Sequence, residues 1–238
     1  MTNDASRPQN SNATIGEGTI VESNVTVGLK YHPDCGPARV GKHGILRQGT
    51  VIYGDVELGD YFQTGHHAII RAKVRTGDYC TVCNRSTLEG LIRLGTGVRI
   101  MSHVYIPSRT WAGDHVFIGP GVIFLNDRYP GRWEGAAPTP RGATIEDDVM
   151  IGGGSTILPE VTIGRRSFIA AGAVVTKSVP PRSLVKGCPG RVEPLPRELD
   201  RAMDRTLALQ PADFWHPELP GVMDQDWPKD WPERWDDR

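Results

Sequence analysis

Two histidines and an arginine are placed at equal intervals along the chain. His67, Arg85 and His103 follow one another 18 residues apart. Histidine is the usual general base in proteins, because its unperturbed pKa of about 6.5 lies close to neutral pH. Equal spacing brings side chains into line only where the backbone itself repeats. The elements around these residues therefore decide whether they can act together.

The chain carries an aliphatic residue at every sixth position. The repeat runs over residues 15–27, 40–124 and 145–175, and 20 of its 24 positions are Ile, Leu or Val. A glycine often follows, and a second small or branched residue comes four positions after the first. A helix would need apolar spacings of three and four, and an ordinary strand would alternate at two. A period of six instead predicts a short strand and a tight turn, repeated three times in each coil of a stacked solenoid.

This geometry predicts eight coils with a core of aliphatic residues, small residues near the corners, and glycines that ease the turns. His67 and His103 occupy the same place in their repeats and are two coils apart. We therefore expect them on one line with Arg85 between them, about 10 Å from each other by two strand spacings. Asn84 lies next to that line.

Composition and charge limit the function classes. The net charge of −1 gives no general attraction to nucleic acid or to anionic membranes. The first residues are polar and unlike a secretory signal, and no stretch is long and apolar enough to span a bilayer. We therefore expect a cytoplasmic protein whose four cysteines stay reduced. Cys80 and Cys83 form a CxxC motif, but a zinc site would need two more ligands at short spacing, so we interpret them as structural thiols.

Two late stretches, residues 151–164 and 170–181, read Ile-Gly-Gly-Gly-Ser-Thr-Ile-Leu-Pro-Glu-Val-Thr-Ile-Gly and Ala-Ala-Gly-Ala-Val-Val-Thr-Lys-Ser-Val-Pro-Pro. With them the chain resembles the hexapeptide-repeat acyltransferases over residues 13–192. The resemblance implies an all-β fold, a left-handed parallel β-helix, assembled as a homotrimer that uses coenzyme A or acetyl-CoA as co-substrate, with no metal expected. The general rule for parallel crossovers predicts the opposite hand, so the handedness comes from the resemblance.

A narrower resemblance concerns the acceptor. Residues 116–130 and 64–71 look like segments of the N-acyltransferases that act on nucleotide-linked amino sugars. In those enzymes the first segment ends much like Thr-Asn-Asp-Arg-Tyr-Pro, whereas this chain has Leu125 at the place of the threonine. The resemblance implies transfer of an acetyl group to the amine of such a sugar, held by Arg85, Glu89, Asn126, Asp127, Arg128 and Tyr129. An alternative is that residues 126–129 only anchor the base of a loop.

The catalytic candidates are His103, Asn84 and His67. Acyl transfer needs a base for the acceptor, donors for the oxyanion, and a thioester held beside the acceptor. His103 is our first choice for the base. Some relatives lack a protein base and use an Asn to hold the amine, a role that Asn84 could take. We interpret His66 and His115 as surface turn residues.

The coenzyme A site follows from the resemblance. In the family the pantetheine arm runs along small residues of the late coils, where bare backbone permits close approach. The matching residues here are Gly152, Gly153, Ala171 and Gly172. A basic end for the nucleotide phosphates matches Lys177, Lys186 and Arg191, because cations suit phosphate.

The repeat is interrupted at residues 28–39 and 125–143, which we predict to be loops, and it stops after Val192. Residues 193–238 are predicted to form a separate tail. Its first part, residues 194–209, has the pattern of one amphipathic helix. Four tryptophans follow, and we expect them to pack on the barrel or on a neighbouring subunit. They are Trp215, Trp227, Trp231 and Trp235.

Three other functions remain open. An O-acetyltransferase would use the same site on a hydroxyl. A γ-type carbonic anhydrase would bind zinc through His67 and His103, but the third histidine of that pattern is Ser108 here, and His43, His66 or His115 would have to replace it. A scaffold without catalysis would not bind coenzyme A. The sequence does not decide between acetyl and longer acyl donors.

Overall fold

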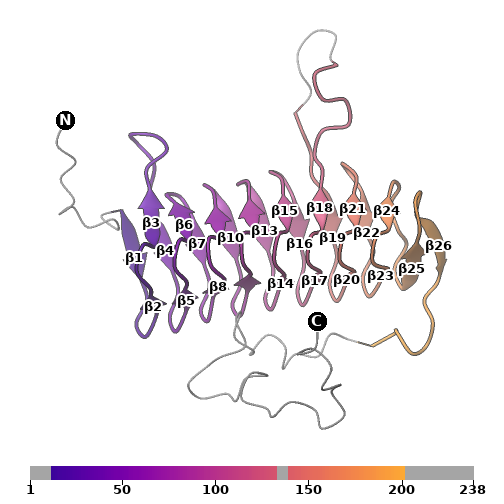
Figure 1. Ribbon diagram of the computed structural model, residues 1–238, viewed down its shortest axis with the longest axis horizontal. Helices are drawn as coiled ribbons and strands as arrows, with labels where there is room; N and C mark the ends of the chain where they lie inside the picture. The colour runs from indigo at the N-terminus through magenta and orange to yellow at the C-terminus, as the bar shows by residue number, and fades with distance from the viewer. Residues whose placement is uncertain (1–11, 133–138, 202–238) are drawn as a thin grey trace, which may run out of the picture.

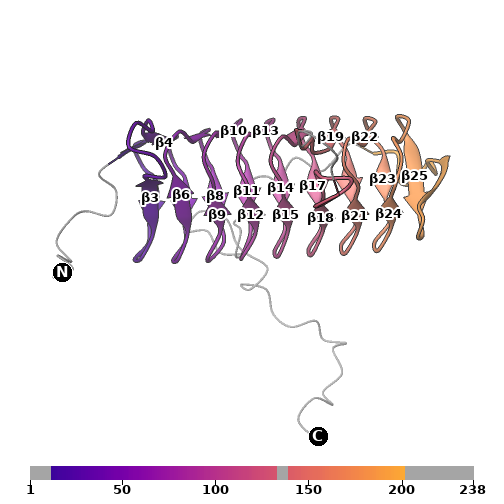
Figure 2. The same cartoon turned by 90° about the horizontal axis from the view of Figure 1, so that it is seen from above.

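A computed structural model describes residues 12–132 and 139–201, and these residues form a three-sided prism of parallel strands. Figures 1 and 2 show the coils following one another along a single axis. Each coil contributes one strand to each of three sheets, which we name A, B and C. The fold is the left-handed parallel β-helix, and its eight coils agree with the number predicted from the repeat.

Sheet A has eight strands, all parallel. They are β1 Ala13–Ile15, β4 Ala38–Val40, β7 Glu57–Leu58, β10 Val74–Thr76, β13 Ile92–Leu94, β16 Trp111–Ala112, β19 Thr144–Ile145 and β22 Thr162–Ile163. Sheet C also has eight strands. They are β3 Thr26–Leu29, β6 Val51–Tyr53, β9 Ile69–Ile70, β12 Thr87–Leu88, β15 Tyr105–Ile106, β18 Ile123–Phe124, β21 Thr156–Ile157 and β24 Val174–Val175.

Sheet B has ten strands because a hairpin is added at its end. They are β2 Ile20–Val21, β5 Ile45–Leu46, β8 Gln63–Thr64, β11 Thr81–Val82, β14 Arg99–Ile100, β17 Phe117–Ile118, β20 Met150–Ile151, β23 Phe168–Ile169, β25 Ser183–Lys186 and β26 Arg191–Pro194. β26 pairs antiparallel with β25. This antiparallel strand ends the regular stacking of coils.

The aliphatic residues of the repeat fill the prism as predicted. Ile52, Ile70, Leu88 and Ile106 lie above one another in sheet C, and each is fully buried. Because every coil repeats the same inward position, the core is one continuous column rather than a separate cluster in each coil.

The glycines have a different role from the one that the sequence suggested. Left-handed φ angles occur at the third residue after the aliphatic one, and 16 such residues are not glycine. The glycines directly after the aliphatic residues instead permit close stacking of coils. A Cβ at Gly59 would lie 2.4 Å from the carbonyl oxygen of Gly77, closer than real contacts allow. Glycine is therefore required there by the distance between coils, not by the turn.

The repeat is interrupted at both places that the sequence indicated. Residues 30–37 join β3 to β4, so the first interruption is shorter than the predicted 28–39. The second lies between β18 and β19, and its described parts, residues 125–132 and 139–143, project from the prism in Figure 1. The predicted helix at 194–209 does not start where expected: Pro194 ends β26, and residues 195–201 form turns and irregular chain. The rest of that segment and the four tail tryptophans lie outside the described residues. The described residues contain no helix that is long and apolar enough to cross a bilayer.

Candidate functional site

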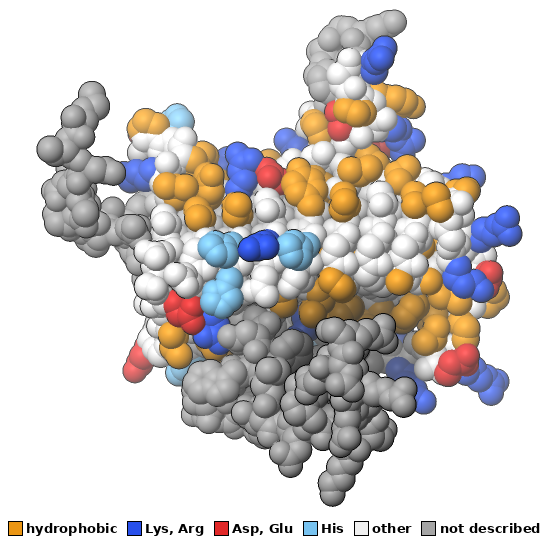
Figure 3. Space-filling model, in the orientation of Figure 1, with side chains coloured by type: hydrophobic (Ala, Val, Ile, Leu, Met, Phe, Trp, Pro, Cys, Tyr) orange, Lys and Arg blue, Asp and Glu red, His pale blue; other side chains and the backbone are white. Residues whose placement is uncertain are grey.

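The line of His67, Arg85 and His103 lies along one edge of the prism. Each residue occupies the turn between a sheet B strand and the next sheet C strand, which we call the B–C corner, and each has a left-handed φ of 54–61°. Backbone hydrogen bonds fix the line: the amides of Arg85 and His103 donate to the carbonyls of His66 and Asn84, each at 2.9 Å. A row of His, basic and His side chains is visible on the face shown in Figure 3.

The two histidines of this line have different surroundings. The His67 ring leans over the preceding coil, where a Cβ at Gly49 would lie 2.3 Å from its Nδ1. The coil before His103 carries Arg85 at the same place, so His103 has no glycine to lean over. His67 is therefore directed away from the late coils, and His103 is the histidine of the line that adjoins them.

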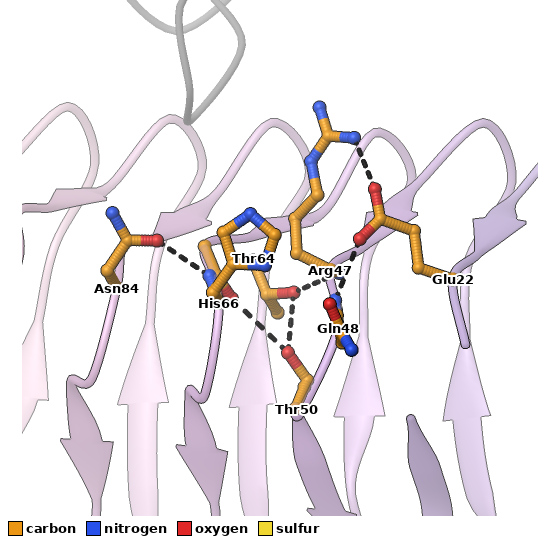
Figure 4. A network of polar contacts seen from close by, with 8 residues as sticks. Glu22, Arg47, Gln48, Thr50, Thr64, His66 and Asn84 are labelled. Atoms are coloured by element: carbon orange, nitrogen blue, oxygen red, sulfur yellow. Dashed lines mark hydrogen bonds and ion pairs between the residues drawn. The ribbon is translucent and has the colours of Figure 1, made fainter. Parts of the chain in front are cut away.

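Asn84 has a structural contact that the sequence did not reveal. Its Oδ1 accepts a hydrogen bond from the His66 amide at 2.6 Å. Asp60, Asp78 and Asp114 make the same contact with the preceding coil at the corner between sheets A and B, at 2.7–2.8 Å. The Asn84 oxygen is thus occupied in the turn, and its NH₂ group points away (Figure 4). The group available to a substrate is a donor, which suits an oxyanion better than an amine.

An ion pair at the start of the line was missed from the sequence. Arg47 donates to Glu22 at 2.6 Å, and the Gln48 amide donates to the other Glu22 oxygen at 2.8 Å (Figure 4). Burial alone would raise the pKa of Glu22, but these hydrogen bonds and the charge of Arg47 outweigh it and hold that pKa below its ordinary value. Both residues follow an aliphatic position of the repeat, where glycine is common. A charged pair in successive coils at this place was the available signal.

Three glycines continue the line beyond His103. Gly121, Gly154 and Gly172 occupy the same place in the B–C corner, with φ of 68–71°. A Cβ at any of them would meet nothing within 4 Å, so the backbone is bare and open on the outside. We call the line formed by His103 and these glycines the corner trough. Counting three residues on from Ile118 and Ile151 would have found Gly121 and Gly154.

The four small residues predicted to line the coenzyme A site do not all face outward. A Cβ at Gly152 would lie 2.4 Å from the Ala171 amide nitrogen, so Gly152 serves stacking between coils. Gly153 is also confined, because a Cβ there would lie 3.0 Å from the Pro120 carbonyl oxygen. Ala171 directly precedes Gly172 at the same corner. Of the four residues, only Gly172 lies in the corner trough.

The three basic residues predicted to bind the coenzyme A phosphates lie at two different edges of the prism. Lys186 and Arg191 are opposite each other in β25 and β26, at the end of the corner trough, and Lys186 Nζ lies 2.7 Å from Glu193. Lys177 follows β24 and lies at the C–A corner, the turn from sheet C to sheet A. Lys186 and Arg191 are thus placed beside Gly172, whereas Lys177 is at the other edge of sheet C.

The predicted acceptor-binding residues do not meet the His line within one protomer. Glu89 begins a turn at the C–A corner and forms an ion pair with Arg71. The segment 126–129 leaves from the same corner, so the width of sheet C separates both from His103. Asn126 donates to Ser108 Oγ at 3.2 Å, and Asp127 accepts from the Tyr129 amide at 2.9 Å.

The Asn126 contact joins the base of the segment to the preceding coil, whereas the Asp127 contact closes a turn within the segment itself. Arg128 reaches Glu160 at 3.8 Å, and Tyr129 is 61% exposed. Tyr129 is therefore the residue of this segment that has most surface left for a ligand.

The CxxC pair is structural, as interpreted. Cys80 is fully buried and its thiol donates to the Gly95 carbonyl at 3.0 Å. Burial raises the pKa of this thiol to about 12, which makes it a poor nucleophile and a poor metal ligand. Within residues 12–132 and 139–201, no three side chains of His, Cys, Asp or Glu converge on a metal site.

Comparisons with known proteins agree with this architecture. Residues 142–177 match the family model described as bacterial transferase hexapeptide (six repeats). The LpxA structure from Bacteroides fragilis, described as a UDP-N-acetylglucosamine acyltransferase, superimposes with a TM-score of 0.62 over 84% of this chain and 73% of that one, at 14% identity. That likeness concerns the fold. The chain therefore carries hexapeptide repeats and folds as a left-handed parallel β-helix.

Curated relatives include the bifunctional protein GlmU of Shouchella clausii, 26% identical over 189 residues. GlmU of Trichlorobacter lovleyi is 31% identical over 173 residues. These matches cover 73% and 72% of this chain but only 38% and 33% of the relatives, so the chain spans about a third of their length.

Proposed function

We propose that this protein is a coenzyme A-dependent acyltransferase that transfers an acetyl group from acetyl-CoA to the amine of a nucleotide-linked amino sugar. The observation that carries the proposal is the corner trough. Bare, outward-facing backbone at Gly121, Gly154 and Gly172 leads along one edge directly to His103. An extended thioester arm lying on that backbone would end about one strand spacing, roughly 5 Å, from the imidazole.

The residues at the end of the trough supply the groups that the reaction needs. The amine nitrogen of the sugar attacks the thioester carbonyl carbon, and His103 takes the proton that this nitrogen loses. The outward NH₂ of Asn84 donates to the developing oxyanion, a stabilisation that is often the largest single contribution to acyl transfer. The carbon–sulfur bond then breaks, an amide remains on the sugar, and the proton leaves with the coenzyme A thiol. Lys186 and Arg191, at the far end of the trough, suit the nucleotide phosphates of the donor.

The proposal includes a homotrimer, because one protomer lacks the second wall of the site. Sheet C presents an outward row of apolar side chains, in which Ile69, Tyr105 and Ile123 are 38%, 40% and 45% exposed. Figure 3 shows hydrophobic side chains gathered beside the His row. Burial of this row between copies would bring a neighbouring surface to the His line. The proposal also includes a cytoplasmic location, because the four free thiols would stay reduced there.

The test is a thiol-release assay with acetyl-CoA and UDP- or dTDP-linked amino sugars. We expect His103→Ala to lower kcat by at least about a hundredfold, the usual contribution of a general base. His115→Ala at another corner is the matched control and should leave kcat within about twofold. Full activity in His103→Ala would contradict the assignment of the base.

Asn84→Asp separates the two roles of that residue. The aspartate keeps the oxygen that accepts from the His66 amide, as aspartates do at Asp60, Asp78 and Asp114, but it loses the outward donor. We expect kcat to fall by about a hundredfold with an unchanged melting temperature. Unchanged kcat would exclude the donor role.

The O-acetyltransferase is the second candidate, and the same trough would serve a hydroxyl acceptor. A parallel assay with the matching hydroxyl sugars distinguishes it. The zinc alternative is tested by metal analysis of the purified protein. We expect no bound zinc, because Arg85 lies between His67 and His103 and the described residues offer no third ligand.

A further inference from the structure

A groove of about 770 Å³ lies on the outer face of sheet A and along the C–A corner, away from the His line. Its lining is rich in cations. Arg39, Arg75 and Arg93 come from three strands of sheet A, and Lys73 and Arg109 come from the C–A corner. Trp111 closes one end and is 44% exposed. We call this feature the sheet A groove.

The two carboxylates of the groove are already engaged. Glu57 lies between Arg39 at 3.5 Å and Arg75 at 3.4 Å. Asp55 accepts from the Tyr31 hydroxyl and from the Gly36 amide, each at 2.7 Å. Five cations against two engaged carboxylates leave the groove with an excess of positive charge, although the whole chain has a net charge of −1.

The strand register increases this excess at one place. Arg75 in β10 is directly opposite Arg93 in β13, and Arg93 is directly opposite Trp111 in β16. Like charges directly opposite each other destabilise a sheet. Asp114 and Asp147 line the adjoining hollow that shares Arg75, Arg93 and Trp111. No carboxylate lines the groove itself on the Arg93 strand or beyond it, so an anion in the groove would relieve this repulsion.

The order Arg75, Arg93, Trp111 also indicates what the anion carries. The three side chains follow one another at strand spacing and cover about 10 Å. Arginine forks bind phosphate oxygens in pairs, and an exposed indole ring stacks on a planar base. We propose that the sheet A groove binds a nucleoside diphosphate, with its phosphates against Arg75, Arg93 and Arg109 and its base against Trp111.

This inference deepens the proposed function, and it rests on that function for one point only: that the diphosphate belongs to the acyl acceptor. The groove and His103 lie on either side of sheet C in one protomer. A single acceptor would therefore join them only between two copies, as in the proposed trimer. Binding of the free diphosphate depends on neither point.

The experiment is isothermal titration of the full chain with UDP and dTDP at low salt and without acetyl-CoA. We expect binding of at least one of them, weakened about tenfold by Arg93→Gln and about tenfold by Trp111→Ala. Lys42→Gln removes an exposed cation outside the groove and should leave the affinity unchanged. All three positions are on the surface, and melting temperatures confirm that the variants fold.

Two smaller probes test the parts of the ligand. Uridine alone and inorganic pyrophosphate alone should each bind more weakly than UDP. The inference is overturned if either binds as tightly as UDP, if no diphosphate binds, or if Arg93→Gln and Trp111→Ala bind like the unchanged protein. Diphosphate binding without acetyl transfer would contradict the proposed function and leave the groove site intact. Transfer with unaltered binding in both variants would contradict the groove site alone.

Discussion

The two histidines of the line His67, Arg85 and His103 occupy the same position of the repeat but have different surroundings. His67 leans over Gly49 toward the first coils, whereas His103 borders the corner trough. The Oδ1 atom of Asn84 accepts a hydrogen bond within the turn, so its NH₂ group is the part left for a ligand. Glu22 and Arg47 form an ion pair at the start of the line, where side-chain exposure is 30% and 11%. We expect this pair to stabilise the early coils rather than to act on substrate.

Substitution of Glu22 by Gln should make stability less dependent on pH. The folded-state pKa of Glu22 lies below its ordinary value, so its charged form stabilises the fold above about pH 4.3. That contribution is lost as the pH falls through the lower, folded-state pKa. At pH 7 we expect Glu22→Gln to lower the free energy of unfolding by about 1–2 kcal/mol, and at pH 3 the difference should shrink.

Denaturant titrations at several pH values measure this effect. Glu17→Gln, an exposed carboxylate in the same coil, is the control and should follow the unchanged protein throughout. A Glu22→Gln variant that is equally stable at pH 7 would show that the pair contributes nothing.

At the scale of the elements, each corner of the prism has its own use. The B–C corner carries the His line and the corner trough, whereas the corner between sheets A and B carries a ladder of stacked rings. In that ladder His43 and Tyr61 lie 5.2 Å apart, and Tyr61 and Tyr79 lie 4.6 Å apart. The same left-handed turn thus holds bare glycine on one edge and aromatic rings on another.

A side chain placed in the corner trough should block the donor. Gly154→His adds an imidazole at a left-handed position of the kind that His67 and His103 already occupy, so the turn tolerates it. We expect the KM for acetyl-CoA to rise at least about tenfold, because the pantetheine arm loses its close contact with the backbone.

Glu160→His is the matched control, since it lies in the same coil at the C–A corner with a φ of 61°. Its KM for acetyl-CoA should change by less than about twofold in steady-state assays. Equal effects of the two substitutions would place the donor elsewhere.

At the scale of the whole molecule, the faces formed by sheets A and C differ in character. Sheet A presents the charged groove and sheet C presents the apolar row, and the long segment 125–143 leaves between them. The His line and the base of the segment 125–143 lie at opposite edges of sheet C. The proposed acceptor site would therefore need a second copy of the chain.

Charges introduced on sheet C should separate the copies. We expect the double variant Ile69→Glu and Ile123→Glu to elute as a monomer in size-exclusion chromatography with light scattering, and to lose most of its transferase activity although His103 is intact. Ile20→Glu, which is 51% exposed on sheet B, should keep the oligomer. A trimer that persists in the double variant would exclude sheet C as the interface.

The period of six predicted a stacked three-sided solenoid from the sequence alone, whereas the left hand of the helix came from the family resemblance. The period also predicted eight coils, the buried aliphatic column and the line of His67, Arg85 and His103, because each coil repeats one backbone geometry and spacing then converts directly into position. The same count would also have found Gly121 and Gly154. Where the repeat stops, after Val192, the predicted helix did not begin in the described residues, because no periodic neighbour constrains that segment.

Only the tertiary structure decided which way side chains and backbone face. It separated Gly152, which is pressed against the next coil, from Gly172, which is open to the outside. It turned the Asn84 oxygen into the corner and put Lys177 and Glu89 on the opposite edge of sheet C. These outcomes depend on contacts between coils 18 or more residues apart, and a repeat fixes where a residue lies along the prism but not what it touches.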